Sequence, residues 1–156
     1  MERICRLITL DDTKRLGAVL AAALQSTDTI TLQGDLGVGK TELARAIIQS
    51  LTQSTEVVPS PTFTLVQTYD TPKGVLWHFD LYRLKTPEEA YELGIDEALA
   101  DGIALIEWPK KLGDRSYQNH LDVHLSLDSL TQERQCVLKG SGHWQEFLKT
   151  EEVLWR

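Results

Sequence analysis

The chain has 156 residues, a length that most simply forms one domain and can bury a substantial core. Its net charge of −7 disfavours a broad nucleic-acid surface of its own, because such surfaces are usually basic, although a local basic patch could still form. No apolar run approaches the length of a membrane span, and Cys5 and Cys136 fit no CxxC or metal-binding spacing. We therefore expect a cytoplasmic protein with reduced thiols and no membrane partner.

The N-terminal third begins with a strand, a helix and a second strand. Residues Arg3–Ile8 have strand character. Thr9 and Asp12 then form a capping pattern ahead of a helix that we expect from Asp12 to Gln25. The β-branched, alternating run Thr29–Gln33 predicts the second strand.

Residues 34 to 41 match the phosphate-binding pattern G-x-x-x-x-G-K-[ST], and an apolar helical pattern follows them to about Leu51. Glycines let backbone N–H groups turn toward a phosphate chain. Lys40 places a positive charge at the β- and γ-phosphate oxygens, and the Thr41 hydroxyl can ligate Mg²⁺. The pattern therefore predicts a site for a nucleoside triphosphate and magnesium. Its predicted binding residues are Gly34, Gly37, Val38, Gly39, Lys40, Thr41 and Glu42.

The middle of the chain predicts a loop and a hairpin. Pro59-Ser60-Pro61 marks the loop, and the runs Phe63–Tyr69 and Val75–Leu81 predict antiparallel strands joined by a turn at residues 70–74. Pro87 opens a short helix, and we expect Gly94 to end it.

The last third predicts three strands and a helix. Ile103–Ile106 is a continuous apolar run, typical of a strand buried on both faces, and strands His120–Leu127 and Cys136–Lys139 follow. A C-terminal helix carries Trp144, Phe147 and Leu148. Together the elements predict a three-layer α/β fold of the P-loop NTPase kind, with a mixed sheet, a parallel nucleotide-binding core and some antiparallel strands.

A magnesium–nucleotide site also needs carboxylates near the phosphates. Asp80 and Glu107 each end a predicted strand, and either could hold Mg²⁺ through water or orient the attacking water molecule. The alternative for each is an acid that only caps a turn. The hydroxyl-rich loop 60–64 lies where many phosphate-loop switches carry a threonine that senses the γ-phosphate, and an ordinary loop is the alternative there.

Two other nucleotide functions find less support. Guanine recognition usually needs Asn-Lys-x-Asp after a strand, whereas Asn119–Asp122 lacks the lysine and begins a strand. A small-molecule kinase would need a lid with arginines, but Arg83 and Arg115 are isolated, so this function stays the weaker alternative.

Four segments together resemble one family. Gly34–Thr41, Ser60–Leu65, His78–Arg83 and Ile106–Pro109 have the order and spacing of the TsaE (YjeE) family, and the resemblance covers essentially the whole chain. It implies a single P-loop ATPase domain that hydrolyses ATP weakly with Mg²⁺ and serves tRNA threonylcarbamoyladenosine (t6A37) synthesis. It also implies action with the TsaB–TsaD heterodimer, while TsaC supplies the threonylcarbamoyl-adenylate. Contact with tRNA would be indirect, through that complex. A nucleotide-regulated binding module with incidental turnover is the alternative.

The same resemblance implies roles for residues. Thr41 and Glu107 would ligate magnesium, Asp80 would be the acid required for hydrolysis, and Thr62 would be the switch residue. With Lys40, Asp80 and Thr62 form the predicted catalytic set.

Further residues would complete the site. Thr13 and Arg134 would approach the adenine and ribose, and Trp108 would shape the site or an interface, with packing in the core as the alternative. His78 could act as a general base, but a structural role is more common for a histidine in this position. Two departures from the family pattern are Glu42, whose charge repels a phosphate, and the basic pair after Pro109.

Overall fold

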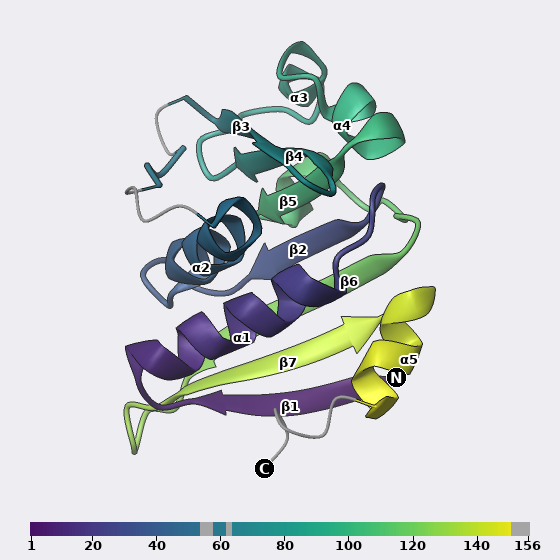
Figure 1. Cartoon of the computed structure of the whole chain (residues 1–156). Helices are drawn as coiled ribbons and strands as arrows, with labels where there is room; N and C mark the ends of the chain where they lie inside the picture. Colours follow the sequence, from purple (N-terminus) through teal and green to yellow (C-terminus); the bar gives the residue numbers. More distant parts are fainter. Residues whose placement is uncertain (54–57, 62–63, 151–156) are drawn as a thin grey trace.

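The computed structural model describes residues 1–53, 58–61 and 64–150. A seven-stranded sheet with the order β1-β7-β6-β2-β5-β4-β3 forms its centre (Figure 1). The strands are β1 (Glu2–Leu7), β2 (Thr29–Gln33), β3 (Val66–Thr71), β4 (Gly74–Asp80), β5 (Ile103–Glu107), β6 (His120–Leu127) and β7 (Arg134–Gly140). The helices are α1 (Leu10–Ala23), α2 (Lys40–Thr52), α3 (Glu89–Glu92), α4 (Ile95–Asp101) and α5 (His143–Thr150), with a 3-10 turn η1 (Pro109–Leu112).

The middle of the sheet is parallel and its edges are antiparallel. β2 pairs in parallel with both β5 and β6, and β4 pairs in parallel with β5. The pairs β1–β7, β6–β7 and β3–β4 are antiparallel. The predicted mixed sheet with a parallel core is confirmed. Because parallel strands share a direction, the carboxyl ends of β2, β4 and β5 meet at one edge of the sheet.

Helices cover the two faces of the sheet unequally. α1, α2 and α5 pack on one face, where Leu16, Leu43 and Trp144 join one apolar core with inward-facing strand residues. α3, α4 and η1 cover the other face over β4 and β5, in a second core that includes Phe79 and Ile106. The predicted three-layer fold is therefore confirmed. On the second face, β2 and β6 carry polar side chains instead.

The start of α1 follows the predicted capping pattern. Thr9 Oγ1 accepts a hydrogen bond from the backbone N–H of Asp12 at 3.2 Å, and Asp12 Oδ2 accepts one from the backbone N–H of Thr9 at 3.0 Å. This reciprocal capping box satisfies backbone donors that the helix leaves without partners. The helix therefore begins at Leu10, two residues before the predicted start.

Other element boundaries also differ from the sequence prediction, and the larger differences lie in the middle of the chain. Gly94 ends α3 as predicted, but its left-handed φ of 87° also lets it begin α4, which was not predicted. β3 starts at Val66, and the predicted start at Phe63 lies outside the described residues.

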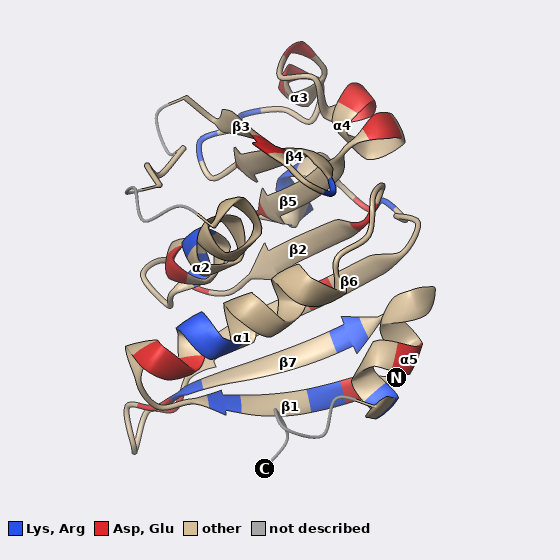
Figure 2. Cartoon of the chain, in the orientation of Figure 1, with Lys and Arg blue, Asp and Glu red and all other residues tan. Residues whose placement is uncertain are grey.

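Charged side chains are distributed unevenly over the molecule. Figure 2 shows acidic residues on α3 and α4 and Lys and Arg residues along β1 and β7.

Cys5 and Cys136 are register partners in the β1–β7 pair. Both are free thiols, and burial raises the pKa of each. None of the helices in the described ranges has the length and apolar character needed to cross a membrane.

Candidate functional site

A glycine-rich loop joins β2 to α2 at the carboxyl edge of the sheet. Gly34 has a φ of 141°, and a Cβ atom there would lie 2.4 Å from the carbonyl oxygen of Leu125 in β6. Only glycine fits this approach. The loop ends at Gly39, and α2 begins at Lys40. The first N–H groups of a helix have no helical partner, so this end of α2 is suited to bind an anion.

The Lys40 ammonium group is held against its own loop. Its Nζ donates to the carbonyl oxygens of Gly34 at 2.6 Å and Asp35 at 2.8 Å. It also lies 4.2 Å from the centre of the Trp108 ring, a cation–π contact. Burial lowers the pKa of Lys40, although nearby carboxylates oppose that shift. A phosphate bound in the loop would compete with these carbonyl oxygens for the ammonium group.

Glu107 at the end of β5 is fixed through both carboxylate oxygens. Thr41 Oγ1 donates to Glu107 Oε1 at 2.8 Å, and His78 Nε2 lies 2.7 Å from Glu107 Oε2. Glu107 and His78 are buried, with 1% and 0% of their surface exposed. The carboxylate is therefore oriented toward the first turn of α2.

The oxygens of Thr41 and Glu107 fit a magnesium ion. Mg²⁺ prefers hard oxygen ligands, usually keeps several waters and commonly takes one or two protein carboxylates plus substrate phosphates. In the part of the chain that the structure describes, no group of three or more His, Cys, Asp and Glu side chains could hold a metal alone. This arrangement suits an ion shared with a bound phosphate more than a closed protein cage.

Asp80 lies beside Glu107 at the same edge of the sheet. The two residues are register partners in the parallel β4–β5 pair, so the two predicted strand-end acids do come together. Asp80 is 5% exposed, and its Oδ1 accepts a hydrogen bond from the backbone N–H of Tyr82 at 3.1 Å.

A cavity of about 220 Å³ lies between the loop and these strand ends. Tyr82 and Trp108 contribute aromatic rings whose centroids are 5.0 Å apart. The residues that line it are Leu36, Gly37, Gly39, Lys40, Thr41, Glu42, Asp80, Tyr82, Glu107 and Trp108. Most of the residues predicted from the sequence therefore share one cavity.

The remaining predicted residues lie around this cavity or apart from it. Arg134, the first residue of β7, has guanidinium atoms 3.5 Å from where a Cβ on Gly39 would be. Val38 is buried in the core behind the loop. Thr13 is buried on α1, and its hydroxyl has no hydrogen-bond partner among the described residues. Thr62 lies outside the described residues.

The contact between His78 and Glu107 was not predicted. The two-residue period of a strand puts His78 on the same face as Asp80, and this signal was present in the sequence. Its partner depends on the register between β4 and β5, which the sequence does not give. Because Nε2 is engaged with Glu107 and the ring is buried, the geometry favours a positioning role over that of a general base.

Several known proteins are similar to this chain. Residues 7–136 match the family model described as "Threonylcarbamoyl adenosine biosynthesis protein TsaE". The tRNA threonylcarbamoyladenosine biosynthesis protein TsaE of Rickettsia bellii is 49% identical over 117 residues, or 75% of this chain and 81% of that protein. The Bacillus subtilis protein of the same name is 34% identical over 139 residues, or 88% of this chain and 77% of that protein.

A solved structure has the same fold. The crystal structure of Bacillus subtilis YdiB matches with a TM-score of 0.76 and 28% identity, covering 97% of this chain and 93% of that one. The family match runs from the last residue of β1 into β7 and so includes the phosphate loop, Asp80 and Glu107. This chain belongs to the TsaE family of threonylcarbamoyl adenosine biosynthesis proteins.

Proposed function

We propose that this chain is a weak magnesium-dependent ATPase that serves tRNA threonylcarbamoyladenosine (t6A37) synthesis together with a TsaB–TsaD heterodimer. The observation that carries the proposal is the convergence of Lys40, Thr41 and Glu107 on one cavity. They supply an ammonium group, a hydroxyl and a carboxylate, the groups that a triphosphate and its metal require. Membership of a family named for threonylcarbamoyl adenosine biosynthesis supports the pathway.

The triphosphate of ATP would lie along the loop, against its backbone N–H groups and the start of α2. Lys40 then exchanges the carbonyl oxygens of Gly34 and Asp35 for phosphate oxygens. Arg134 beside Gly39 and the unpaired hydroxyl of Thr13 are the groups proposed for the adenosine side. The place of Arg134 beside Gly39 supports its assignment, and the unpartnered buried hydroxyl supports that of Thr13.

Magnesium bound by Thr41 and Glu107 would neutralise charge on the β- and γ-phosphate oxygens. Because Thr41 and Glu107 already touch at 2.8 Å, little rearrangement separates this structure from a metal-binding one. His78 keeps the Glu107 carboxylate turned toward that position.

In hydrolysis, Asp80 orients the attacking water and accepts its proton. The water oxygen bonds to the γ-phosphorus, the bond from that phosphorus to the bridging oxygen breaks, and ADP and phosphate leave. The position of Asp80 beside Glu107 on the cavity wall supports this role. Thr62, which precedes β3 in the sequence, is the proposed sensor of the γ-phosphate.

Binding to TsaB–TsaD would use the nucleotide-sensing face around Thr62, Arg83 and Trp108. Tyr82 stands beside this face with 42% of its surface exposed and in ring contact with Trp108. Because the chain carries a net charge of −7, the partner complex supplies most contacts to tRNA.

Reconstitution tests the proposal. TsaB–TsaD, threonylcarbamoyl-adenylate, unmodified tRNA and ATP are combined with this chain, with its Lys40→Ala variant or without it. Sustained t6A formation only with the unchanged chain, together with ATP hydrolysis that rises when TsaB–TsaD is present, is expected. Phosphate transfer to a small acceptor would instead identify a kinase, and nucleotide-dependent complex formation without turnover would identify a binding module.

A further inference from the structure

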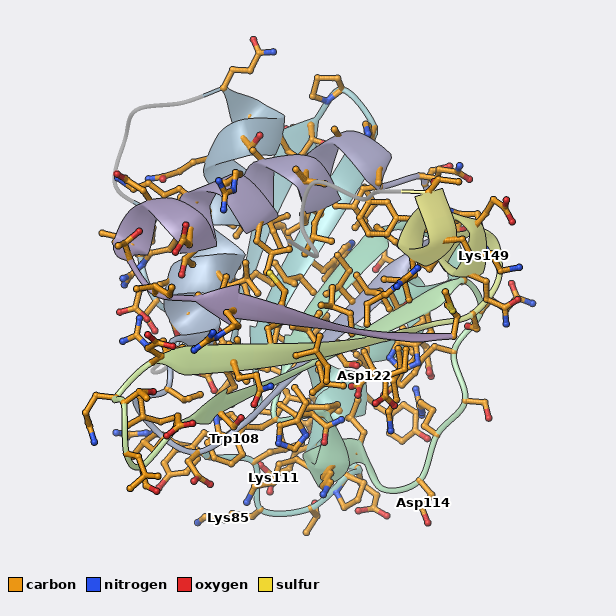
Figure 3. The ribbon with its side chains drawn as sticks, turned by 90° about the horizontal axis from the view of Figure 1, so that it is seen from below. Lys85, Trp108, Lys111, Asp114, Asp122 and Lys149 are labelled. Atoms are coloured by element: carbon orange, nitrogen blue, oxygen red, sulfur yellow. The ribbon has the colours of Figure 1, made fainter. Side chains whose placement is uncertain are left out.

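A second cavity in the described part of the protein is larger than the cavity at the phosphate loop. It measures about 620 Å³ and shares no lining residue with the cavity at the phosphate loop. Its floor is formed by Thr31 and Gln33 of β2 and by His120 and Asp122 of β6. Figure 3 shows Asp122 below β7, on the side of the sheet away from α1, with Trp108, Lys111 and Asp114 on the same side.

This cavity occupies a part of the sheet that helices leave uncovered. Parallel strands such as β2 and β6 are normally covered on both faces and carry apolar residues on both. Here α3 and α4 lie over β4 and β5, η1 reaches only the edge of β2, and β2 and β6 turn polar side chains to the same face. A polar floor at the centre of a parallel sheet suits a polar ligand.

The hydrogen bonds of the floor have a definite direction. The Asp122 carboxylate only accepts, so Thr31 Oγ1 donates to it at 2.6 Å and Gln33 Nε2 donates to it at 2.7 Å. The Thr31 oxygen must then accept from His120 Nε2–H at 2.6 Å. Burial lowers the pKa of His120, which leaves Nδ1 as an acceptor. The hydroxyl proton of Thr31 and the Nε2 proton of His120 are thus both used within the floor, so Asp122 and His120 Nδ1 can accept from a ligand, while Gln33 keeps a second N–H donor beside them.

The rim of the cavity differs in character from its floor. Lys110, Arg115 and Lys139 place positive charge there, next to the Lys and Arg residues of β1 and β7 in Figure 2, and the acids Glu2 and Asp114 lie among them. Lys139 lies 3.5 Å from Glu2, but the pair is exposed and weak enough for a ligand anion to displace it. Tyr117, whose ring is 4.8 Å from that of His120, adds an aromatic wall.

We propose that this cavity binds a nucleoside phosphate whose base carries an exocyclic amino group, either a free nucleotide or an unpaired nucleotide of an RNA. The amino N–H donates to Asp122, the base packs against Tyr117, and the phosphate meets the basic rim. Acceptance of an amino proton by an acidic side chain and packing of a splayed base on an aromatic ring are both general modes of base recognition. His120 and Asp122 would thus read a base on the face opposite to α2, separate from the nucleotide proposed for the phosphate loop.

The test uses the full chain with its phosphate loop saturated by magnesium and a non-hydrolysable ATP analogue, so that added nucleotides report the second cavity. CMP and AMP should bind with a Kd of about 1 mM or below, measured by calorimetry. UMP, which has a carbonyl in place of the amino group, should bind roughly tenfold more weakly. Absence of saturable CMP binding, or equal affinities for CMP and UMP, would overturn the proposal.

Two variants and a control sharpen the test. Asp122→Asn keeps an oxygen for Thr31 and Gln33 but offers an N–H to the ligand, so preference should change from CMP to UMP. Lys139→Ala, at the exposed rim, should weaken CMP and leave cytidine unchanged, because only CMP has a phosphate. Asp101→Asn, an exposed acid of α4 outside the cavity, should change nothing. An Asp122→Asn protein that melts normally and still prefers CMP contradicts the proposal.

Short single-stranded RNAs identify the source of the ligand. Oligocytidylate that binds at least tenfold more tightly than CMP, and more tightly than oligouridylate, supports an RNA ligand in this cavity. Oligocytidylate that binds no more tightly than CMP supports a free nucleotide. Oligonucleotides that bind Asp122→Asn and Lys139→Ala as tightly as they bind the unchanged chain bind elsewhere. If the affinity for CMP is also unchanged in both variants, the proposal is contradicted.

Discussion

Lys40 donates to the carbonyl oxygens of its own loop, and the proposed function would offer it the phosphate oxygens of a nucleotide as a second set of partners. In the structure it uses the first set, at 2.6 and 2.8 Å, together with the Trp108 ring. The loop carbonyl groups therefore keep a buried charge solvated while no anion is present. Binding of a phosphate replaces a neutral acceptor with a charged one.

Lys40→Ala should weaken MgATP binding while the fold persists. The loss of one charge-assisted contact corresponds to about 1.5–3 kcal/mol, or roughly 10- to 150-fold in Kd, measured by calorimetry. Lys149→Ala, an exposed lysine of α5, is the matched control and should bind as the unchanged chain does. Equal affinity in a folded Lys40→Ala protein would contradict a phosphate-binding role.

Asp80 and Glu107 lie side by side but should have separable effects. Glu107→Gln removes the charge that faces Thr41, so MgATP affinity should fall by about tenfold or more, while ATP binding in the presence of EDTA changes little. Asp80→Asn should leave MgATP affinity nearly unchanged and slow single-turnover hydrolysis by roughly 10²–10⁴-fold. Normal hydrolysis by Asp80→Asn would remove it from the catalytic set.

His78 should act on magnesium through Glu107. His78→Leu removes the ring nitrogen that lies 2.7 Å from Glu107 Oε2, whereas His78→Gln keeps an N–H donor. We expect the Leu variant to lose MgATP affinity and the Gln variant to recover part of it, with ATP affinity in EDTA constant in both. Losses that are equal with and without magnesium would indicate a packing role only.

At the scale of single residues, the sequence predicted which side chains carry the chemistry better than it predicted which side chains contact one another. Parallel strands put their carboxyl ends at one edge, so the meeting of Asp80 and Glu107 at the loop could be anticipated. The bond from His78 to Glu107 could not, because a one-residue change of register would turn His78 to the other face. The Trp108 ring can lie over Lys40 because the backbone of Trp108 is left-handed, with a φ of 61°. A tryptophan rarely adopts this conformation, so the sequence did not predict the contact.

Helix α1 is flanked by two carboxylates whose environments differ. Asp12 in its first turn accepts hydrogen bonds from the backbone N–H groups of Thr9 and Ile8, which lower its pKa below 3.8. Asp28, in the turn that follows, is fully buried, and desolvation raises its pKa above 3.8 despite contacts with Gln25 and His143. The two groups should therefore act on stability with opposite dependence on pH.

The sign of each pH dependence follows from whether the folded or the unfolded state binds the proton more tightly. Stability from Asp12 is present above pH 3.8 and is lost as pH falls through its lowered folded pKa. Stability from Asp28 is present below pH 3.8 and is lost as pH rises through its raised folded pKa. The Tm of Asp12→Asn relative to the unchanged chain should thus fall with rising pH, whereas that of Asp28→Asn should rise. For a chain of this size, about 1 kcal/mol corresponds to roughly 2–4 °C in Tm.

Asp70→Asn, an exposed carboxylate on β3, serves as the control and should follow the unchanged chain at every pH. A difference in Tm between Asp28→Asn and the unchanged chain that is the same at every pH would come from the lost hydrogen bonds to Gln25 and His143. The change of this Tm difference with pH is therefore the quantity that decides. Relative Tm values of Asp12→Asn and Asp28→Asn that change with pH in the same direction would contradict the opposite pKa shifts of the two carboxyl groups.

Elements with a clear local pattern were predictable, and elements set by tertiary contacts were not. The alternation in Thr29–Gln33 places β2 correctly and the cap at Thr9 places α1 to within two residues, because local pattern and tertiary packing agree there. α4 was missed because Gly94 usually ends a helix, whereas here its left-handed conformation also starts the next one. η1 owes its position to packing of Leu112 in the second core, a contact that local sequence does not specify.

For the molecule as a whole, the acidic balance limits direct contact with tRNA. The chain carries 23 acidic and 16 basic side chains, and phosphate contacts supply most non-specific affinity. The isolated protein should bind tRNA only weakly at physiological salt, and ATP should strengthen its binding to TsaB–TsaD. Submicromolar tRNA affinity in a fluorescence titration, or complex formation that is indifferent to nucleotide, would contradict this expectation.

The strand order also determines when the protein can begin to work during its synthesis. β1 pairs with β7, which leaves the ribosome almost a whole chain length later, and β2 waits for both β5 and β6. Pairings between such distant segments form slowly, because the long intervening chain must be ordered first. The phosphate loop is translated early, but Glu107 and Arg134 follow much later. A nascent chain therefore cannot assemble the proposed nucleotide site until β7 has been synthesised.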